Sequence, residues 1–377
     1  MRALYRSALE SVRVAESLAA VDPREWNALA GDQPFVRHEF FSALIDTGCA
    51  AAGSGWLPRF LLLYRAGALA GGMPLFAKSH SYGEYVFDWA WADAHERHGI
   101  DYYPKLVCAV PFTPVRGARI LGKGKEILID AALQLARETS SLHVLFPRDE
   151  EAELLAAQGM MLRRTVQFHW RNRGYADFDA FLAALSHGRR KNIRQERRRV
   201  REAGVAFRWL EGRSIERQHW EYFSRCYRRT YALHRSSPYL NLDFFLRLGD
   251  SLPEHTALLL AERDGRPVAA ALFLRDASSL YGRYWGATEH IPLLHFECCY
   301  YQAIEYAIAR RLEVFEGGAQ GEHKLFRGLM PVETLSAHWL AHPRFARAVE
   351  SFLEREGAGI ARYVDELCEH SPFKEAG

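Results

Sequence analysis

The sequence lacks any apolar run of the roughly 20 residues that a membrane-crossing helix requires. The run 57–64, one of the longest, is interrupted by Pro58 and Arg59. The N-terminal segment carries Glu10 and Glu16 and has no continuous apolar core, so it does not resemble a secretory signal. We therefore expect a cytoplasmic protein with no membrane span.

Motifs for metal binding and nucleotide hydrolysis are also missing. The six cysteines form no CxxC pair and match no zinc framework, so we expect reduced thiols. Asp93, His95 and His98 have a spacing that a metal cluster could use, but ordinary polar positions of a helix explain them better. No GxxxxGKS or HExxH motif occurs. We expect no bound metal.

Charge is nearly balanced over the chain, with 49 Lys and Arg against 46 Asp and Glu, but it is unevenly distributed. Segment 186–204 reads SHGRRKNIRQERRRVREAG and predicts a helix with Ile193 and Val200 on a thin apolar seam. Four arginines share one face of it: Arg190, Arg194, Arg198 and Arg201. A solvated surface is the simple interpretation. The density of like charge favours binding of a polyanion, such as a nucleotide pyrophosphate or a tRNA backbone. Nothing indicates a DNA-reading motif.

An internal repeat indicates the architecture. Residues 56–93 and 255–288 each read as an apolar strand, a tight turn, a second strand and a third strand, which is entered through 82–85 or 281–284. Ala66-Gly67 and Asp264-Gly265 occupy the first turns, and Asp-Gly between apolar runs is typical of a hairpin.

Each predicted meander continues in the same way. A helix and a strand are expected at 123–139 and 141–147, and again at 296–311 and 312–318. Three-stranded meanders of this kind form the centre of the acetyltransferase (GNAT) fold. We therefore predict an α+β protein of two tandem GNAT-like domains, 1–174 and 175–377, with mixed central sheets flanked by helices. The second domain opens with the basic helix.

The sequence resembles the Fem aminoacyltransferases, which have twin GNAT-like domains. The resemblance rests on Arg190-Lys191-Asn192-Ile193-Arg194 with Gly204-Val205, and on the order Gly317-Gly318, Gly321, Lys324, Gly328. It is closer to a bacterial group of peptidoglycan biosynthesis or recognition proteins. Four segments that cover much of the chain carry that likeness: 78–94, 102–115, 294–305 and 318–324.

The resemblance implies transfer of an acyl or aminoacyl group from an activated donor to an amine, with a cell-wall precursor or another small molecule as acceptor. Acyl-CoA or aminoacyl-tRNA would be the co-substrate, and no tightly bound cofactor is expected. Two alternatives stay open: a plain acyl-CoA-dependent N-acyltransferase of an unrelated metabolite, and a non-catalytic peptidoglycan-binding protein.

Candidate catalytic residues lie mainly in the second half. Lys324 follows a glycine loop that would let a ligand approach the backbone at Gly318 and Gly321, and the resemblance favours it for binding an oxyanion or phosphate. Glu322 and His323 are candidate bases beside it. Glu297, at the start of the helix after the second meander, is another candidate base.

An aromatic and acidic run in the first half predicts an acceptor pocket. If 84–93 is a strand, Trp89 and Trp91 share one face, and Asp88 is a further catalytic candidate. The other residues assigned to this pocket are Asp93, Tyr102, Tyr103, Lys105, Tyr284 and His295.

The donor site has two candidates. Arg190, Lys191 and Arg194 of the basic helix would bind donor phosphates. Arg119-Ile-Leu-Gly122-Lys-Gly124, just before a predicted helix, fits the RxxGxG pyrophosphate loop of CoA-binding GNAT enzymes and would place the donor in the first half. The sequence does not decide between them.

Overall fold

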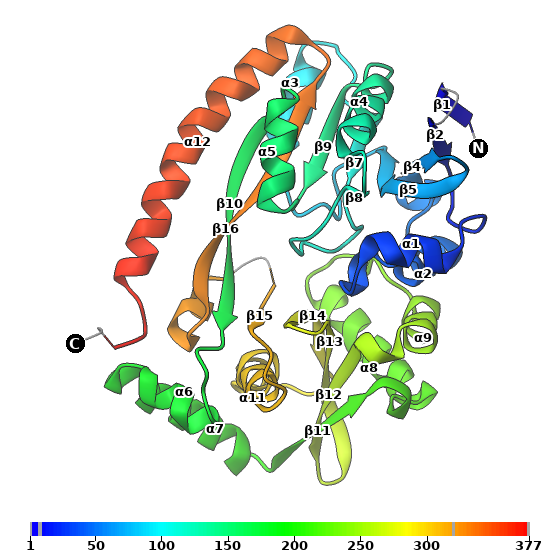
Figure 1. Ribbon diagram of the computed structural model, residues 1–377. Helices are drawn as coiled ribbons and strands as arrows, with labels where there is room; N and C mark the ends of the chain where they lie inside the picture. Colours follow the sequence, from blue (N-terminus) through cyan, green and yellow to red (C-terminus); the bar gives the residue numbers. More distant parts are fainter. Residues whose placement is uncertain (1, 7–9, 319–320, 375–377) are drawn as a thin grey trace. The chain divides into compact units, whose positions relative to one another are not determined.

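A computed structural model of the chain describes residues 2–6, 10–318 and 321–374, and it combines helices with mixed sheets (Figure 1). The chain divides into two compact units. Unit 1 comprises Met1–Thr165 and Glu333–Arg362, and unit 2 comprises Val166–Val332 and Tyr363–Gly377. The chain therefore passes from unit 1 to unit 2 after Thr165, whereas the predicted boundary lies after Gly174. Residues 333–362 return to unit 1, which the sequence did not predict.

Unit 1 holds one antiparallel sheet with the strand order β1-β2-β4-β5-β8. Its strands are β1 (Arg2–Arg6), β2 (Glu10–Ala15), β4 (Phe60–Arg65), β5 (Ala68–Met73) and β8 (Leu121–Gly122). The hairpin between β4 and β5 turns at Ala66 (φ 47°) and Gly67 (φ 86°), as the sequence predicts.

A second group of strands in unit 1 is mixed. β6 pairs antiparallel with β3 and β7, β7 pairs parallel with β9, and β9 pairs antiparallel with β16. Their bounds are β3 (Trp56–Pro58), β6 (Leu75–Lys78), β7 (Lys105–Cys108), β9 (Ser141–Leu145) and β16 (Met330–Leu340). The helices of this unit are α1 (Pro23–Ala30), α2 (His38–Asp46), α3 (Trp89–Arg97), α4 (Lys125–Ala136), α5 (Asp149–Ala157) and most of α12 (Pro343–Glu369).

The predicted third strand of the first meander is wrong. Pro74 separates β5 from β6, and β6 joins the other group of strands, so residues 79–88 form a loop. The expected strand around residue 89 is the helix α3 instead. Its alanines favour a helix, and Trp91 and His95, four residues apart, share its buried face.

Unit 2 contains a mixed sheet in the order β11-β12-β13-β14-β15-β10. β14 and β15 are parallel, and the other neighbours are antiparallel. The strands are β10 (Met161–Arg171), β11 (Val205–Glu211), β12 (Thr256–Arg263), β13 (Arg266–Arg275), β14 (Ser279–Ala287) and β15 (Val314–Glu316). The second predicted meander, β12 to β14, is confirmed, with Asp264 (φ 51°) and Gly265 (φ 73°) in its first turn.

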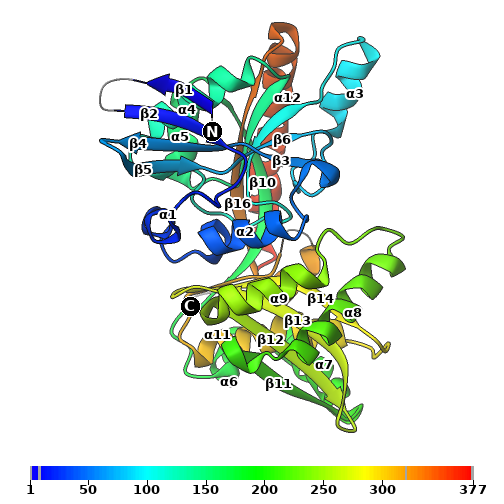
Figure 2. The same ribbon diagram turned by 90° about the vertical axis from the view of Figure 1, so that its right-hand side faces the viewer.

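Helices cover both faces of this sheet. α8 and α9 lie on one face and α11 on the other (Figure 2). The helices are α6 (Phe178–Ala184), α7 (His187–Glu202), α8 (Arg217–Leu233), α9 (Leu242–Ser251), α10 (Leu294–Phe296) and α11 (Gln302–Ala309). A π-helical turn, Glu297–Tyr301, joins α10 to α11. α7 is the predicted basic helix, and Ile193 and Val200 are its buried residues.

Among the described residues, no helix combines the length and the apolar character needed to cross a bilayer.

Candidate functional site

Lys324 is a buried cation in unit 2. It lies in a 3₁₀ helix, Glu322–Arg327, with 3% of its surface exposed, and its Nζ donates a hydrogen bond to the carbonyl oxygen of Gly318 at 2.8 Å. No carboxylate of the described residues lies within ion-pair distance of it. Burial lowers the pKa of Lys324 to about 8. An ammonium group without a counter-ion is costly to bury, which is typical of a side chain that serves a ligand.

The glycines before Lys324 have positive φ angles. Gly318 (φ 87°) and Gly321 (φ 113°) both lie in the region that favours glycine. A Cβ added to Gly321 would lie 2.5 Å from the ring of His323, which folds back over the loop. Two members of the GAQGEHK motif, Ala319 and Gln320, lie outside the described residues.

Two histidines lie close to Lys324 in this electropositive cluster. Nε2 of His323 lies 3.0 Å from the hydroxyl of Tyr300, and the ring of His295 packs against Trp285 and Tyr300. Burial, and then the neighbouring His323, Arg327 and Lys324, lower the pKa of His295 to about 4. Burial, Arg327 and Lys324 also lower the pKa of His323. Both rings are therefore neutral near pH 7 and can accept protons or hydrogen bonds.

Arg327 fixes the backbone of this cluster. It donates to the carbonyl oxygen of His323 at 2.8 Å and to both oxygens of Glu196 at 3.0 Å, and its guanidinium lies 3.6 Å from the ring centre of Phe296. We call Lys324, His323, His295, Tyr300 and Arg327 the Lys324 cluster.

The π-helical turn supplies part of this cluster. Tyr300 comes from it, and Cys299 of the same turn is close enough to Lys324 to affect its pKa. One-turn π-helices inside α-helices are rare and occur frequently at functional sites. The sequence predicted an uninterrupted helix here, because the extra residue of a π-turn leaves no periodic signal over so short a segment.

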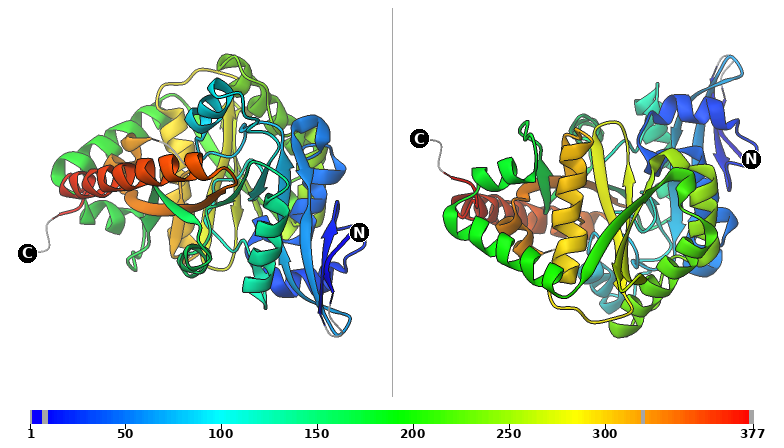
Figure 3. Two further views of the ribbon diagram at one scale, coloured as in Figure 1. Left: turned by 90° about the horizontal axis from the view of Figure 1, so that it is seen from above. Right: turned by 90° about the horizontal axis from the view of Figure 1, so that it is seen from below.

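Glu297 and Glu322 do not join the Lys324 cluster. Glu297 is buried, accepts hydrogen bonds from Nε of Arg197 at 3.0 and 3.2 Å, and accepts another from Gln302 at 2.9 Å. Arg197 also bonds to Glu305, so α7 lies beside α11 (Figure 3). Glu322 is exposed and accepts a hydrogen bond from the hydroxyl of Tyr363 at 2.5 Å. These contacts give Glu297 the geometry of a structural ion pair rather than of a free base.

A basic groove of about 800 Å³ follows α7 in unit 2. Within it, Arg194 pairs with Asp179 and Arg198 pairs with Glu202. No acidic partner among the described residues neutralises the remaining cations of the groove face, Arg190, Lys191 and Arg201. The donor residues expected on α7 therefore line one groove, in which Arg190 and Lys191 are unneutralised and Arg194 is paired.

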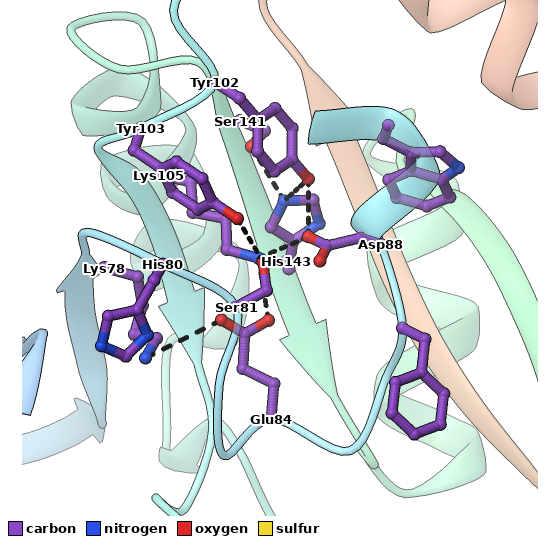
Figure 4. A network of polar contacts seen from close by, with 12 residues as sticks. Lys78, His80, Ser81, Glu84, Asp88, Tyr102, Tyr103, Lys105, Ser141 and His143 are labelled. Carbon is purple, nitrogen blue, oxygen red and sulfur yellow. Dashed lines mark hydrogen bonds and ion pairs between the residues drawn. The ribbon is translucent and has the colours of Figure 1, made fainter. Parts of the chain in front are cut away.

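A second group of polar residues is enclosed in unit 1 (Figure 4). Lys105 is fully buried on β7, and its Nζ donates to Ser81 at 2.7 Å, to Glu84 at 2.8 Å and to Asp88. The hydroxyl of Tyr102 donates to the same oxygen of Asp88 at 2.6 Å. Burial opposes the charge on Lys105, but Glu84 and Asp88 outweigh it and raise the pKa of Lys105.

Several members of this network were not predicted. The hydroxyl of Tyr102 lies 3.2 Å from Nε2 of His143, and Nδ1 of His143 lies 2.7 Å from Nδ1 of His338 on β16. Nζ of Lys78 lies 3.8 Å from the ring centre of Trp56 and 4.0 Å from Glu84. Burial lowers the pKa of Lys78 to about 7, raises that of Glu84 to about 7 and lowers that of His143 to about 3.

The first-half residues of the predicted acceptor pocket do not share one surface. Asp88, Tyr102 and Lys105 are buried in the network of Figure 4, and Tyr103 reaches it through Ser81 at 2.9 Å. The remaining first-half residues lie on α3: Trp91 packs on His338, Asp93 is exposed and pairs with Arg97, and Trp89 is exposed beside Tyr82. Tyr284 and His295 belong to unit 2.

Arg119 is enclosed in unit 1 and its side chain bonds to the backbone. With 1% of its surface exposed, it donates to the carbonyl oxygens of Leu145 at 2.7 Å and Val115 at 2.6 Å. A Cβ on Gly122 would meet the carbonyl oxygen of Ala70 at 2.5 Å, so this glycine allows close strand packing. Gly124 precedes α4 with a φ of 68°. The Arg119 side chain is therefore taken up by backbone carbonyl groups, and Gly122 has a packing role in this structure.

The chain is similar to known proteins both in sequence and in fold. A family profile described as peptidoglycan biosynthesis/recognition matches residues 17–375. The crystal structure of FemX is 11% identical, with a TM-score of 0.54 over 88% of this chain and 98% of that one. The C-terminal domain of a putative lysylphosphatidylglycerol synthetase from Agrobacterium fabrum is 10% identical, with a TM-score of 0.52 over 88% of this chain and 95% of that one. No curated protein matches. The likeness to FemX confirms the predicted α+β fold over most of both chains.

Proposed function

The chain belongs to the FemAB-like family of peptidoglycan biosynthesis/recognition proteins, and we propose that it is an enzyme that transfers an acyl or aminoacyl group to an amine. The observation that carries the proposal is the burial of Lys324 without an acidic partner among the described residues. An ammonium group has three N–H donors, and the carbonyl oxygen of Gly318 takes one of them. The other donors can bind an oxygen that becomes negative during the reaction.

The reaction follows from this geometry. The acceptor amine attacks the carbonyl carbon of the donor ester or thioester, a C–N bond forms, and the carbonyl electron pair moves onto oxygen. Lys324 stabilises that oxyanion by charge and hydrogen bonding, as donors in an oxyanion hole do. The C–O or C–S bond of the donor then breaks, and the amide product and the leaving group separate.

The proton that the amine loses needs an acceptor. His323 is neutral, is oriented by Tyr300, and lies next to Lys324 in the chain, so we assign it this role. The same imidazole can return the proton to the leaving oxygen or sulfur. The nearby positive charge of Lys324 and Arg327 favours release of that proton.

The groove along α7 is the proposed site for the donor's phosphates. Arg190, Lys191 and Arg194 contribute to one end of the groove and Arg201 to the other. The helix rise places residues 190 and 201 about 16 Å apart. A row of this length exceeds a single pyrophosphate and matches successive phosphates of a polynucleotide, which favours aminoacyl-tRNA over acyl-CoA as the donor.

The acceptor in this proposal is an amine of a cell-wall precursor, which the family description supports. The same description includes recognition, so the second candidate is a protein that binds peptidoglycan fragments without chemistry. Such a protein could also use a buried lysine for binding, but it needs no neutral imidazole beside that lysine, and His323 supplies one here.

The test is a transfer assay on the full chain with radiolabelled donors. Aminoacyl-tRNA and acyl-CoA are offered separately, each with an amine-bearing muropeptide precursor. Label in the precursor with either donor supports the proposal, and the donor that works identifies the co-substrate. Binding of the precursor without transfer from any donor would instead support recognition.

A further inference from the structure

A cationic surface on the far side of unit 2's sheet from α11 is not explained by the proposed function. Residues 222–242 contain no aspartate or glutamate, although they contain four arginines and His234. This stretch forms the C-terminal part of α8 and the segment that leads to α9. The other strongly basic helix, α7, contains two glutamates.

The helix geometry gathers these arginines on one face. Trp220, Phe223 and Tyr227 are buried on the side of α8 that packs on the sheet (Figure 2). Arg225, Arg229 and Leu233 follow at intervals of four residues, so they form one row on the exposed side. Arg228 lies beside this row, and Arg235 follows the end of the helix. We call Arg225, Arg228, Arg229, Leu233 and Arg235 the α8 patch.

The arginines of the α8 patch lack acidic partners among the described residues. Two other exposed arginines of unit 2 are paired: Arg208 with Glu262 at 2.6 Å, and Arg217 with Glu221 at 2.9 Å in the first turns of α8 itself. The negative end of the helix dipole accounts for a cation or two in the last turn. It does not account for the absence of every acidic side chain over 21 positions.

Leu233 is the apolar element of this patch. It is 71% exposed, which is the largest value among the exposed large hydrophobic residues that the structure describes. Tyr231 of the same helix and Tyr239 of the segment after it have ring centres 5.9 Å apart, and both are partly exposed. Tyrosine, arginine and an exposed aliphatic side chain together are typical of a surface that meets the boundary of a lipid bilayer.

We propose that the α8 patch docks this protein reversibly on an anionic lipid surface. The arginines bind the phosphates of the headgroups, and Leu233 enters the interfacial layer between them. A lipid surface is favoured over a nucleic acid because an exposed leucine gains nothing from a phosphate backbone and gains burial in a bilayer. The proposal concerns a surface distinct from the Lys324 cluster and the α7 groove, and it does not depend on the proposed transfer reaction.

The experiment is co-sedimentation of the full chain with vesicles. Vesicles of equal parts phosphatidylglycerol and phosphatidylcholine are compared with pure phosphatidylcholine at low and at physiological salt. We expect binding only to the anionic vesicles, weakened by salt. The double variant Arg228→Glu/Arg229→Glu should bind roughly tenfold or more weakly because each arginine near the surface contributes independently. Leu233→Ser should bind several-fold more weakly.

The matched control is Arg217→Gln, which removes an arginine from the same helix outside the patch and should leave vesicle binding unchanged. All substituted side chains are exposed, and thermal unfolding checks that each variant is folded. Equal binding to both vesicle types, binding to neither, or full binding by the double variant would overturn the proposal. An effect of the double variant on RNA binding alone would also overturn it. Transfer to a soluble acceptor should be unaffected, which separates this surface from the reaction.

Discussion

Nζ of Lys324 lies 2.8 Å from the carbonyl oxygen of Gly318, and this hydrogen bond closes the loop that precedes the 3₁₀ helix. The bond orients the ammonium group without neutralising it, because a carbonyl group carries no net charge. The lysine is thus held in place and keeps its positive charge for a ligand. Lys324 can therefore stabilise an oxyanion that forms beside it.

The α7 groove should govern donor binding. Arg190→Glu together with Lys191→Glu should weaken binding of aminoacyl-tRNA by about tenfold or more and reduce the salt dependence of the affinity, because phosphate contacts release counter-ions. Filter binding at several salt concentrations measures both effects. Arg199→Glu, on the same helix but outside the groove, is the matched control. Equal losses in the control and the double variant would mean that α7 acts only through its overall charge.

Gly321→Ala should impair transfer through His323. An added Cβ would meet the His323 ring at 2.5 Å, and the φ of 113° is unfavourable for alanine, so the ring must move away from Tyr300. We expect a fall in kcat of roughly tenfold or more with little change in donor affinity, since a displaced base affects the chemical step. Gly53→Ala, where nothing lies within 4 Å of the added atom, is the control. An unchanged kcat would remove His323 from the mechanism.

Lys105 should be a main determinant of stability in unit 1. Lys105→Met leaves the buried carboxylates of Glu84 and Asp88 without their cation, and breaking a buried ion pair in this way costs about 3–5 kcal/mol. Denaturant unfolding measures the loss. The triple variant that adds Glu84→Gln and Asp88→Asn should recover part of it. A loss below about 1 kcal/mol for Lys105→Met would contradict the network in Figure 4.

Lys78 should make stability depend on pH in the opposite sense to an ordinary paired lysine. Burial lowers its pKa from 10.5 to about 7 in the folded protein, so between pH 7 and 10.5 the unfolded chain binds more protons than the folded one. The free energy of unfolding should therefore rise with pH across that window, as far as this residue contributes. Lys78→Met should remove the rise without a large loss at pH 7. Urea titrations at several pH values of both proteins provide the measurement, and identical slopes would refute the assignment.

Local chemistry explains which parts of the fold could be predicted. The hairpins at Ala66-Gly67 and Asp264-Gly265 depend on residues with positive φ next to each other in sequence. α7 is visible from its charge and its two apolar positions. The prediction for 79–97 was wrong because alternating aromatic residues suggested a strand. The structure has a helix at 89–97 instead, and Trp91 and His95 are buried on one face of it.

The site residues, like the fold, could be predicted only where they lie close together in the sequence. The Lys324 loop was found because glycines and a lysine lie within a few residues of one another. The network around Lys105 was found only in part, since Lys78, His143 and His338 come from three strands that meet only after folding. The pairing of Glu297 with Arg197 joins residues 100 apart, so no sequence spacing could indicate it. Arg119 matched a short motif, but burial and contacts with carbonyl oxygens decide its role.

The most direct test of the account is the single-turnover rate of transfer by Lys324→Met, with Lys123→Met, an exposed lysine of unit 1, as control. Loss of an oxyanion-stabilising donor should lower this rate by about 10²–10³-fold. The melting temperature should not fall, because the substitution removes a buried charge without a counter-ion. In the native enzyme the rate should also decline as pH rises through about 8, where Lys324 loses its proton. A Lys324→Met protein that is folded, binds donor and transfers at the native rate would contradict the central claim.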